Sequence, residues 1–344
     1  MKNILRFFIL ITFFGIPSGS FSQDIHFSQV EFSPLTLNPG LVGANSTLQG
    51  IVNYRNQWSS VGIPYRTFAA SLDARFNENK RNKNGIIAGG ITLFNDQSGD
   101  LNISTNNVNI YLAYHLILDR KSTLGIGMYG GFGQRTINPN FGRWSSQYDG
   151  MGYNSSISSG ETFNSPSFSY GDVGAGIVYT YKKRQGYITQ NDQRACNIGF
   201  AAYHVNKPAY SFLNESGEQL YVRFSMFANA TIGLQNSRGS ILPGLYIQRQ
   251  KSSMEVLYGL YYKYQLNEGS VFTGFNRPIA IYFGLFNRFK DALVGKFMLE
   301  LDQFSTGFAY DVVISGLTEV AKAKGGFELF LRFNIGDGGG FRNK

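Results

Sequence analysis

The histidines are the first residues to test for chemistry, because a catalytic site needs a nucleophile with a base, or paired carboxylates on a rigid scaffold. The chain of 344 residues has three, His26, His115 and His204. Its sequence contains no HExxH, paired CxxC or GxSxG pattern, so the spacings of metalloproteases, zinc sites and serine hydrolases are missing. We interpret each histidine as a polar lining residue, and the sequence predicts no enzyme, no metal and no cofactor.

Two other patterns resemble ligand sites. The glycines at 125–133 could suggest a phosphate loop, but no Lys-Ser/Thr pair opens a helix after them. Asp96 and Asp100 in NDQSGD could hold calcium, yet Asp, Asn and Ser in such clusters more often cap their own turn. We favour a capped turn.

The most unusual short cluster is RNQW at residues 55–58. In one interpretation Trp58 and Tyr65 present an aromatic contact to a partner, with Arg55 inside the fold. In the favoured one Trp58 is an interfacial anchor, and Arg55 pairs with a carboxylate such as Asp24 or Glu31. The aromatic residues predicted to bind a partner are Trp58, Tyr65, Trp144, Tyr148 and Tyr153, the last three in the long segment 138–167.

The elements that must position these residues are β-strands. Val108, Ile110, Leu112 and further apolar residues to Leu118 alternate with residues such as Asn109, and the pattern recurs at 254–266, 293–302 and 325–335. Only 15% of the residues are charged, while 15% are aromatic and 41 are glycine. A soluble sandwich shows the same alternation, but segments of about ten residues with terminal aromatics favour a barrel whose apolar face meets lipid.

The alternation predicts a transmembrane antiparallel β-barrel of about fourteen strands. We place the strands at 47–57, 65–76, 85–95, 102–118, 122–137, 168–182, 194–206, 220–235, 240–250, 254–266, 279–289, 293–302, 304–315 and 325–335. An even count puts both chain ends in the periplasm and the connections after odd-numbered strands outside. The longest connection, 138–167, then lies outside, whereas 267–278 is longer than an inner turn should be.

The chain divides into four predicted parts. Residues 1–22 form a signal peptide, with Lys2 and Arg6 ahead of an apolar run and small residues before Gln23. Residues 23–46 form an N-terminal segment, 47–335 the barrel and 336–344 a tail. The net charge of +9 comes from basic residues in turns, which favours lipid and lipopolysaccharide headgroups over nucleic acid as partners.

The stretch LGIGMYGGFG at 124–133 predicts what fills the barrel. If its large residues face lipid, then Gly125, Gly127, Gly131 and Gly133 face the lumen, where glycine lets another backbone come close. The candidate occupant is the segment 23–46, acting as a lumenal plug that also contacts Arg55. The alternative, that these glycines only ease strand bending, stays open.

Several motifs resemble one family when they are taken together and in order. They include FSQVEFSPLTLNPGLVGA (27–44), YRNQWSSVGIPYRTFAASLD (54–73), YGGFGQRTINP (129–139), AAYHVNKPAYSFL (201–213) and AYDVVISGLTEVAKAKGGFELFLRF (309–333). They are similar to the PorP/SprF family of type IX secretion system membrane proteins, and the similarity covers nearly the whole mature chain.

This resemblance implies a non-enzymatic outer-membrane component. It would help a secreted partner, such as a large adhesin with a C-terminal type IX secretion signal, to reach or stay on the cell surface, with other secretion components as further partners. The main alternative is a porin-like transporter for a hydrophobic or small polar solute. A soluble periplasmic β-sandwich is the third interpretation.

Overall fold

The computed structural model describes residues 24, 26–60, 62–77, 84–161, 166–183, 191–212, 218–267, 278–316 and 324–337. The predicted signal peptide and positions 338–344 of the predicted tail lie outside the described residues. So do parts of the connections at 77–84, 207–219, 267–278 and 316–325. No helix among the described residues is long and apolar enough to cross a membrane.

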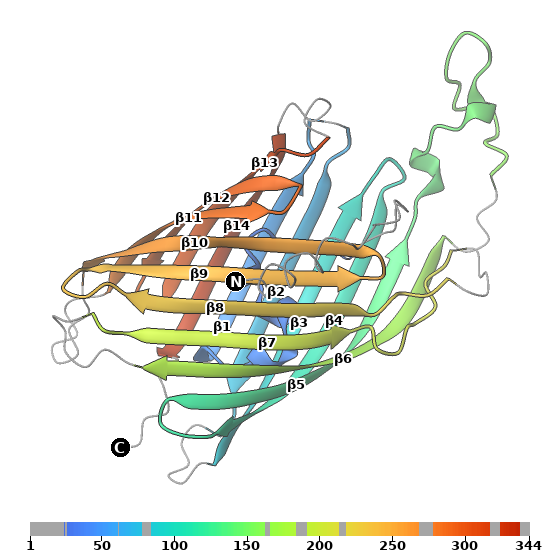
Figure 1. The fold of residues 1–344 in the computed structure, drawn as a ribbon. Helices are drawn as coiled ribbons and strands as arrows, with labels where there is room; N and C mark the ends of the chain where they lie inside the picture. The colour runs from blue at the N-terminus through green and yellow to red at the C-terminus, as the bar shows by residue number, and fades with distance from the viewer. Residues whose placement is uncertain are drawn as a thin grey trace, which may run out of the picture.

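Fourteen antiparallel strands form one closed barrel, in which every strand pairs with its neighbours in sequence and the last pairs with the first (Figure 1). Ser46 lies opposite Asp337 where the first and last strands close the sheet. The strands are β1 (Ser46–Gln57), β2 (Tyr65–Arg75), β3 (Gly85–Ser98), β4 (Ile103–Ile117), β5 (Ser122–Thr136), β6 (Ser167–Lys183), β7 (Arg194–Tyr203), β8 (Arg223–Gly233), β9 (Gly239–Gln250), β10 (Ser253–Asn267), β11 (Ile279–Arg288), β12 (Ala292–Leu301), β13 (Phe304–Val313) and β14 (Lys324–Asp337).

The closed sheet confirms the predicted barrel and excludes two stacked sheets. The largest differences from the predicted bounds are of three residues: β3 continues to Ser98, β8 begins only at Arg223 and β7 ends already at Tyr203. His204 has a φ of 56° and Lys207 a φ of 44°, so the extended backbone cannot continue there. The connection between β7 and β8 instead folds back on itself, with an isolated bridge between Ala209 and Gln219.

The outer face of the barrel is apolar, as the alternation predicted. Ile110, Met128 and Leu285 are 66%, 61% and 59% exposed, and each is flanked in sequence by residues that face inward. Large apolar side chains exposed in this way around a closed sheet match a barrel surrounded by hydrocarbon. Phe132 and Leu331 belong to the same surface.

The two ends of the barrel differ. The terminal end is where β1 begins and β14 ends. The loop end carries the connections after odd-numbered strands, including the extension after β5, whose described residues 137–161 project beyond the barrel (Figure 1). This extension contains two short 3-10 helices, η3 (Pro139–Phe141) and η4 (Ser145–Gln147).

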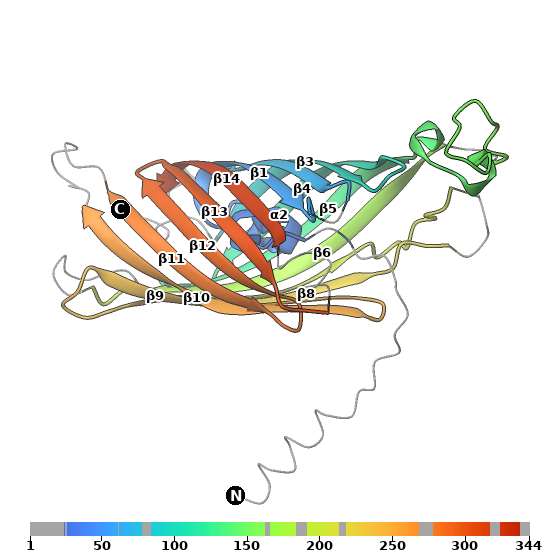
Figure 2. The same ribbon diagram turned by 90° about the horizontal axis from the view of Figure 1, so that it is seen from above.

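The N-terminal segment, residues 26–44, lies inside the barrel as three short turns (Figure 2). These are η1 (Val30–Phe32), α2 (Pro34–Leu37) and η2 (Pro39–Leu41). Pro34 and Pro39 occupy first positions, where a proline needs no backbone donor, and the Asn38 side chain accepts a hydrogen bond from the Gly40 amide at 2.8 Å. Each proline therefore begins a turn and prevents one long helix.

This segment completes the apolar core of the lumen. Val30, Phe32, Leu37 and Leu41 pack against inward side chains of the strands, and the Phe32 ring stacks on Phe330 with a centroid distance of 3.9 Å. A second cluster joins Leu35 and Val42 to β3, β4, β5 and β7 (residues Ala88, Tyr111, Ala113, Tyr129, Ala201 and Tyr203). Each large apolar side chain buried in this way contributes about 1.5–3 kcal/mol.

Candidate functional site

A buried ion pair joins the N-terminal segment to β12. The Lys296 ammonium lies 3.0 Å and 3.1 Å from the two carboxylate oxygens of Glu31, and its side chain is only 1% exposed. The same ammonium lies 3.6 Å from the centre of the Phe286 ring. Because a buried charge is costly without a partner, each of these two residues depends on the other.

Glu328 of β14 binds the backbone of the segment. Its carboxylate oxygens accept hydrogen bonds from the amides of Ser28 and Gln29 at 2.5 Å and 2.8 Å. The Arg55 guanidinium, 2% exposed, pairs with Glu328 at 3.0 Å and with Asp311 at 3.5 Å. The Glu328 carboxylate therefore links the N-terminal segment both to β14, which carries it, and to Arg55 of the neighbouring strand β1.

The predicted pairing of Arg55 with Asp24 or Glu31 is corrected by this arrangement. Arg55 reaches the segment by donating to the carbonyl of His26, while its charge is balanced by carboxylates of the strands. Glu31 is taken by Lys296, and Asp24 lies beside Arg223. The alternation along the strand showed that Arg55 faces the lumen. Which carboxylate it pairs with depends on how the N-terminal segment is oriented inside the barrel.

Near the terminal end, the barrel holds the end of the segment through its backbone. The Gly43 amide donates to Asp73 at 2.7 Å, and Arg75 donates to the Gly43 carbonyl at 2.6 Å. His115 forms a hydrogen bond of 2.6 Å between its Nε2 and the Val42 carbonyl. His115 is thus a satisfied lining residue that contacts the segment.

The four lumenal glycines of β5 divide into two pairs. A Cβ on Gly125 would lie 2.7 Å from the Gly40 carbonyl oxygen, and one on Gly127 would overlap the Pro39 carbonyl. A Cβ on Gly131 would instead meet the Asn109 side chain, and one on Gly133 the side chains of Tyr170 and Asn107. The first pair adjoins the segment, whereas the second makes room for side chains of β4 and β6.

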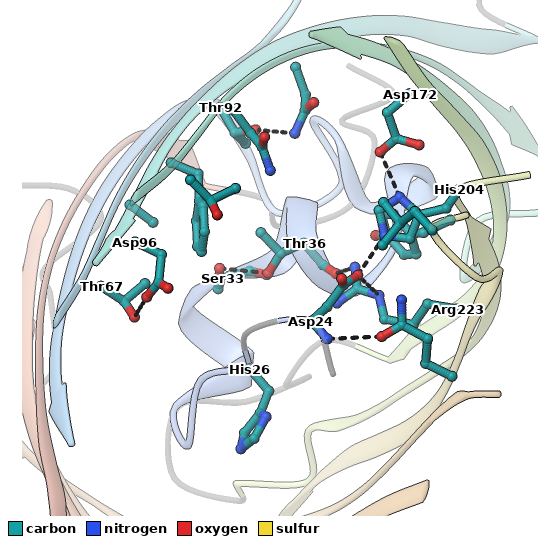
Figure 3. Close-up of a pocket in the computed structure, with 18 of the residues that line it drawn as sticks. Asp24, His26, Ser33, Thr36, Thr67, Thr92, Asp96, Asp172, His204 and Arg223 are labelled. Carbon is teal, nitrogen blue, oxygen red and sulfur yellow. Dashed lines mark hydrogen bonds and ion pairs between the residues drawn. The ribbon is translucent and has the colours of Figure 1, made fainter. Parts of the chain in front are cut away.

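A cavity of about 1030 Å³ lies above the segment at the loop end of the lumen (Figure 3). Its floor includes Asp24, His26, Ser33 and Thr36 of the segment. Its walls come from many strands and from the connection after β7, and include Thr67, Thr92, Asp96, Asn107, Asn109, Tyr111, Tyr129, Arg135, Tyr170, Asp172, Tyr203, His204, Tyr210, Arg223, Gln250 and Arg288.

One wall of this cavity is an ion-pair network centred on His204. Its Nε2 lies 2.5 Å from Asp24 and its Nδ1 2.9 Å from Asp172, while Arg223 lies 3.5 Å from Asp24 (Figure 3). Burial alone lowers the pKa of His204, but the Asp24 charge and the hydrogen bonds to both carboxylates outweigh it and raise the pKa to about 9. Burial raises the pKa of Asp24, yet His204 and Arg223 reverse this and lower it.

Three tyrosine rings line the cavity next to this network. The ring centres of Tyr111 and Tyr129 are 5.4 Å apart, and those of Tyr129 and Tyr203 are 5.3 Å apart. The Tyr129 hydroxyl donates to Asp172 at 2.7 Å, and the Tyr203 hydroxyl donates to the Leu35 carbonyl at 3.0 Å. The rings are therefore held by both stacking and hydrogen bonds.

The remaining sequence candidates lie as follows. His26 pairs with Glu255 at 3.1 Å. Asp96 faces the lumen and accepts a hydrogen bond from Thr67 at 2.8 Å, while Asp100 lies in the turn after β3. In the described part of the chain, no group of three or more His, Cys, Asp and Glu residues could hold a metal ion.

The predicted partner-binding aromatics lie in two places. Trp58 and Tyr65 meet edge to face at 5.2 Å and line the cavity. Trp144 precedes η4, and Tyr148 and Tyr153 form a bridge in the extension between β5 and β6. Tyr148 is 61% exposed, and the Arg143 guanidinium lies 5.3 Å from the centre of the Tyr153 ring.

Sequence reasoning missed the cavity network. Asp172 and Arg223 received no role, although both are charged residues at inward positions of strands whose outward neighbours are apolar. A charged residue at an inward position was the one feature of the sequence that could have indicated a polar site in the lumen. That both Asp24 and Asp172 bind His204 could not be inferred, because His204 lies 180 positions from Asp24 and 32 from Asp172, and only the barrel brings the three together.

The fold and its occupied lumen define an integral β-barrel of the outer-membrane type. Residues 19–333 match the family model described as type IX secretion system membrane protein PorP/SprF, and the chain belongs to this family. The protein is therefore a membrane component of the type IX secretion system and lies in the outer membrane. No curated protein matches the chain.

Several solved structures are similar to parts or most of the chain at low sequence identity. The toluene transporter TodX from P. putida is 9% identical, with a TM-score of 0.44 over 87% of this chain and 93% of that one. The translocator domain of the autotransporter NalP from Neisseria meningitidis is 12% identical, with a TM-score of 0.40 over 89% and 94%. CdiB from Acinetobacter baumannii is 7% identical, with a TM-score of 0.42, and the chain spans 60% of its length. Likeness at this level concerns the fold alone.

Proposed function

We propose that this barrel is a non-enzymatic accessory that assists the secretion or surface attachment of a partner protein bearing a C-terminal type IX secretion signal, such as a large adhesin. The observation that carries the proposal is the filled lumen. Segment 26–44 packs against inward residues from most of the barrel, so the described structure offers no wide passage for a polypeptide. A partner must then be bound at the surface.

In this proposal residues 23–46 are a plug domain of the barrel 47–335. Two sets of contacts support it: the ion pair between Glu31 and Lys296, and the hydrogen bonds that the Ser28 and Gln29 amides donate to Glu328. They attach the segment to the barrel at more than one position. They also disfavour the alternative of an open pore for a small solute. The charged residues in the cavity wall, such as Asp172, His204 and Arg223, disfavour a hydrophobic solute in particular.

The extension between β5 and β6 is the proposed partner surface. With the loop end outside, it is the longest structured segment presented to the cell surface. Exposed Tyr148 and Tyr153, together with Trp144, supply the large aromatic side chains that commonly anchor protein interfaces. Trp58 and Tyr65 form a second, smaller aromatic contact beside the cavity.

The test replaces residues 144–158 with a short Gly-Ser linker in the native bacterium. We expect the surface amount of one large secreted protein to fall at least tenfold, measured by quantitative surface proteomics, while the barrel level in the outer membrane is unchanged. The matched control replaces the turn 118–121 at the terminal end. Unchanged surface proteins, together with altered uptake of small solutes in a gene deletion, would favour the transporter instead.

A further inference from the structure

The two walls of the loop-end cavity differ in charge. The wall made by His204, Arg223 and Arg288 is ionic, but its charges are compensated by carboxylates of Asp24, Glu255 and other neighbours. The opposite wall, on β3 to β6, carries mainly hydroxyl and amide groups, together with Asp96 and Arg135, whose opposite charges act on each other, and with Asp172, which pairs with His204. The cavity therefore presents hydrogen-bonding groups without a large uncompensated charge.

Two cross-strand rows build the opposite wall. Register places Thr92, Asn109, Gly131 and Asp172 side by side on β3 to β6. The next row toward the loop end brings together Asn107, Gly133 and Tyr170. Each glycine lies between two polar side chains, and the Asn109, Asn107 and Tyr170 side chains occupy the space that the glycines leave.

These rows keep unused hydrogen-bonding capacity. Oδ1 of Asp172, a residue only 7% exposed, has no hydrogen-bond partner among the described residues, although its Oδ2 binds Tyr129 and His204. Oδ1 of Asn107 accepts from the Tyr170 hydroxyl at 3.0 Å, and within the described chain its amide nitrogen has no partner. A buried acceptor without a donor is costly, so a rotation of the Asp172 side chain that brought Oδ1 to a ligand hydroxyl would be favourable.

Aromatic rings lie beside the rows. Tyr111, Tyr129 and Tyr170 all line the cavity, and Tyr129 is fixed by its bond to Asp172. Sugar rings combine hydroxyl groups that both donate and accept with apolar C–H faces that stack on aromatic rings. A wall of amides, hydroxyls and one free carboxylate oxygen next to tyrosines is complementary to both features.

A peptide fits the cavity less well. Extended peptides gain affinity by pairing with an exposed sheet edge, and the closed barrel has its inner backbone groups committed to neighbouring strands. Recognition inside the lumen therefore relies on side chains. An acidic or basic ligand would need free charges of the opposite sign, and the ionic wall has already paired most of its own.

We propose that the loop-end cavity binds a neutral oligosaccharide through Asn107, Asn109 and Asp172. Its volume of about 1030 Å³ is at the upper end of ordinary ligand sites, which suits several sugar units. The ligand could be a free glycan or the polysaccharide of lipopolysaccharide, and the shared chemistry is the uncharged polyhydroxylated chain. This inference goes beyond the export role and does not require it.

The experiment uses the full mature chain in detergent and isothermal titration calorimetry. The probes are maltohexaose, cellohexaose, a mannohexaose and the delipidated O-polysaccharide of the native bacterium, with hexagalacturonate and a Gly-Ser hexapeptide for comparison. We expect saturable binding of at least one neutral glycan. Asn109→Leu and Asp172→Asn should each weaken it at least tenfold.

The control variant is Asn197→Leu. Asn197 also faces the lumen, where it donates to Asn229 at 2.8 Å, but it does not line the cavity, so glycan affinity should stay within twofold. Binding by the O-polysaccharide alone would assign the source to lipopolysaccharide, and binding by a hexaose would assign it to free glycans. No binding of any neutral glycan, preference for the hexapeptide or hexagalacturonate, or binding unaffected by Asn109→Leu would overturn the proposal.

Discussion

The two halves of the lumen are made by the same strands and yet differ in content. Toward the terminal end the N-terminal segment fills the interior, and Gly125 and Gly127 adjoin its backbone. Toward the loop end a cavity remains, and Gly131 and Gly133 adjoin neighbouring strands, chiefly the side chains of Asn109, Asn107 and Tyr170. One run of glycines on one face of β5 therefore has two separate structural uses.

A glycine that faces the lumen therefore indicates that another group lies close to the strand, but not whether that group belongs to the N-terminal segment or to a neighbouring strand. In the filled half, apolar packing and the largely buried ion pair of Glu31 with Lys296 hold the segment. In the hollow half, the Asp24 and His204 pair lies beside open space. We expect perturbations to cost most in the filled half and least in the hollow one.

The largest effect is expected at Lys296. Lys296→Met leaves Glu31 buried without its partner, and breaking such a pair costs about 3–5 kcal/mol. The measurement is the free energy of unfolding of the full chain by urea in lipid vesicles. As a control, Lys263→Met removes a lumen-facing lysine that lies 3.8 Å from Glu300 and is 19% exposed, so its cost should be about 1 kcal/mol or less.

A double variant sharpens this first prediction. Adding Glu31→Gln to Lys296→Met should recover much of the lost stability, because no buried charge then remains unpaired. If the double variant is as unstable as Lys296→Met alone, the ion pair is not what holds the N-terminal segment against β12.

The second-largest effect is expected when glycines of β5 are replaced by valine, and it should differ among three of them. Gly127→Val forces a branched side chain against the Pro39 carbonyl, and overpacking of this kind costs about 1–3 kcal/mol. Gly131→Val meets the movable Asn109 side chain and should cost less, while the outward Gly130→Val meets nothing. The readout is maleimide labelling of a cysteine placed at Thr36 in a Cys196→Ser background. Equal labelling rates in all three variants would contradict the division of the glycines.

The smallest effect concerns pH and the hollow half. Because the pKa of His204 is raised from 6.5 to about 9, its contribution is complete below about pH 6.5 and is lost as the pH rises through about 9. After solvent screening in the open cavity we expect about 1 kcal/mol. The free energies of unfolding of wild type and His204→Gln should therefore converge between pH 6 and pH 9.5, and a constant gap would count against the network.

Much of the barrel could be predicted from the chain. Ile110, Met128 and Leu331 were placed on the lipid face by alternation alone, because side chains of a strand point to opposite sides in turn. The fourteen strands followed from the same period, with errors of up to three residues at the ends of β3 and β7 and at the start of β8. Positive φ at His204 ends β7 early. The prolines and missing alternation of 27–44 also marked a segment that could not be a strand.

The partners inside the lumen could not be predicted. Arg55 was expected to meet a carboxylate of the N-terminal segment, but it pairs with Glu328 and Asp311 of distant strands. The cavity wall was also missed, since Asn109 and Asp172 become neighbours only through the register of β4, β5 and β6.

The sequence by itself determined which side of each strand meets lipid, since that choice depends only on the period of two and the hydrophobicity of successive residues. It also predicted room in the interior near the glycines of β5, with easier strand bending as the open alternative. Only the tertiary structure decided what occupies that room at each height. Closure of the sheet sets which residues face one another across the lumen, and the rotation of segment 26–44 sets which charges meet, through contacts between residues up to 300 positions apart.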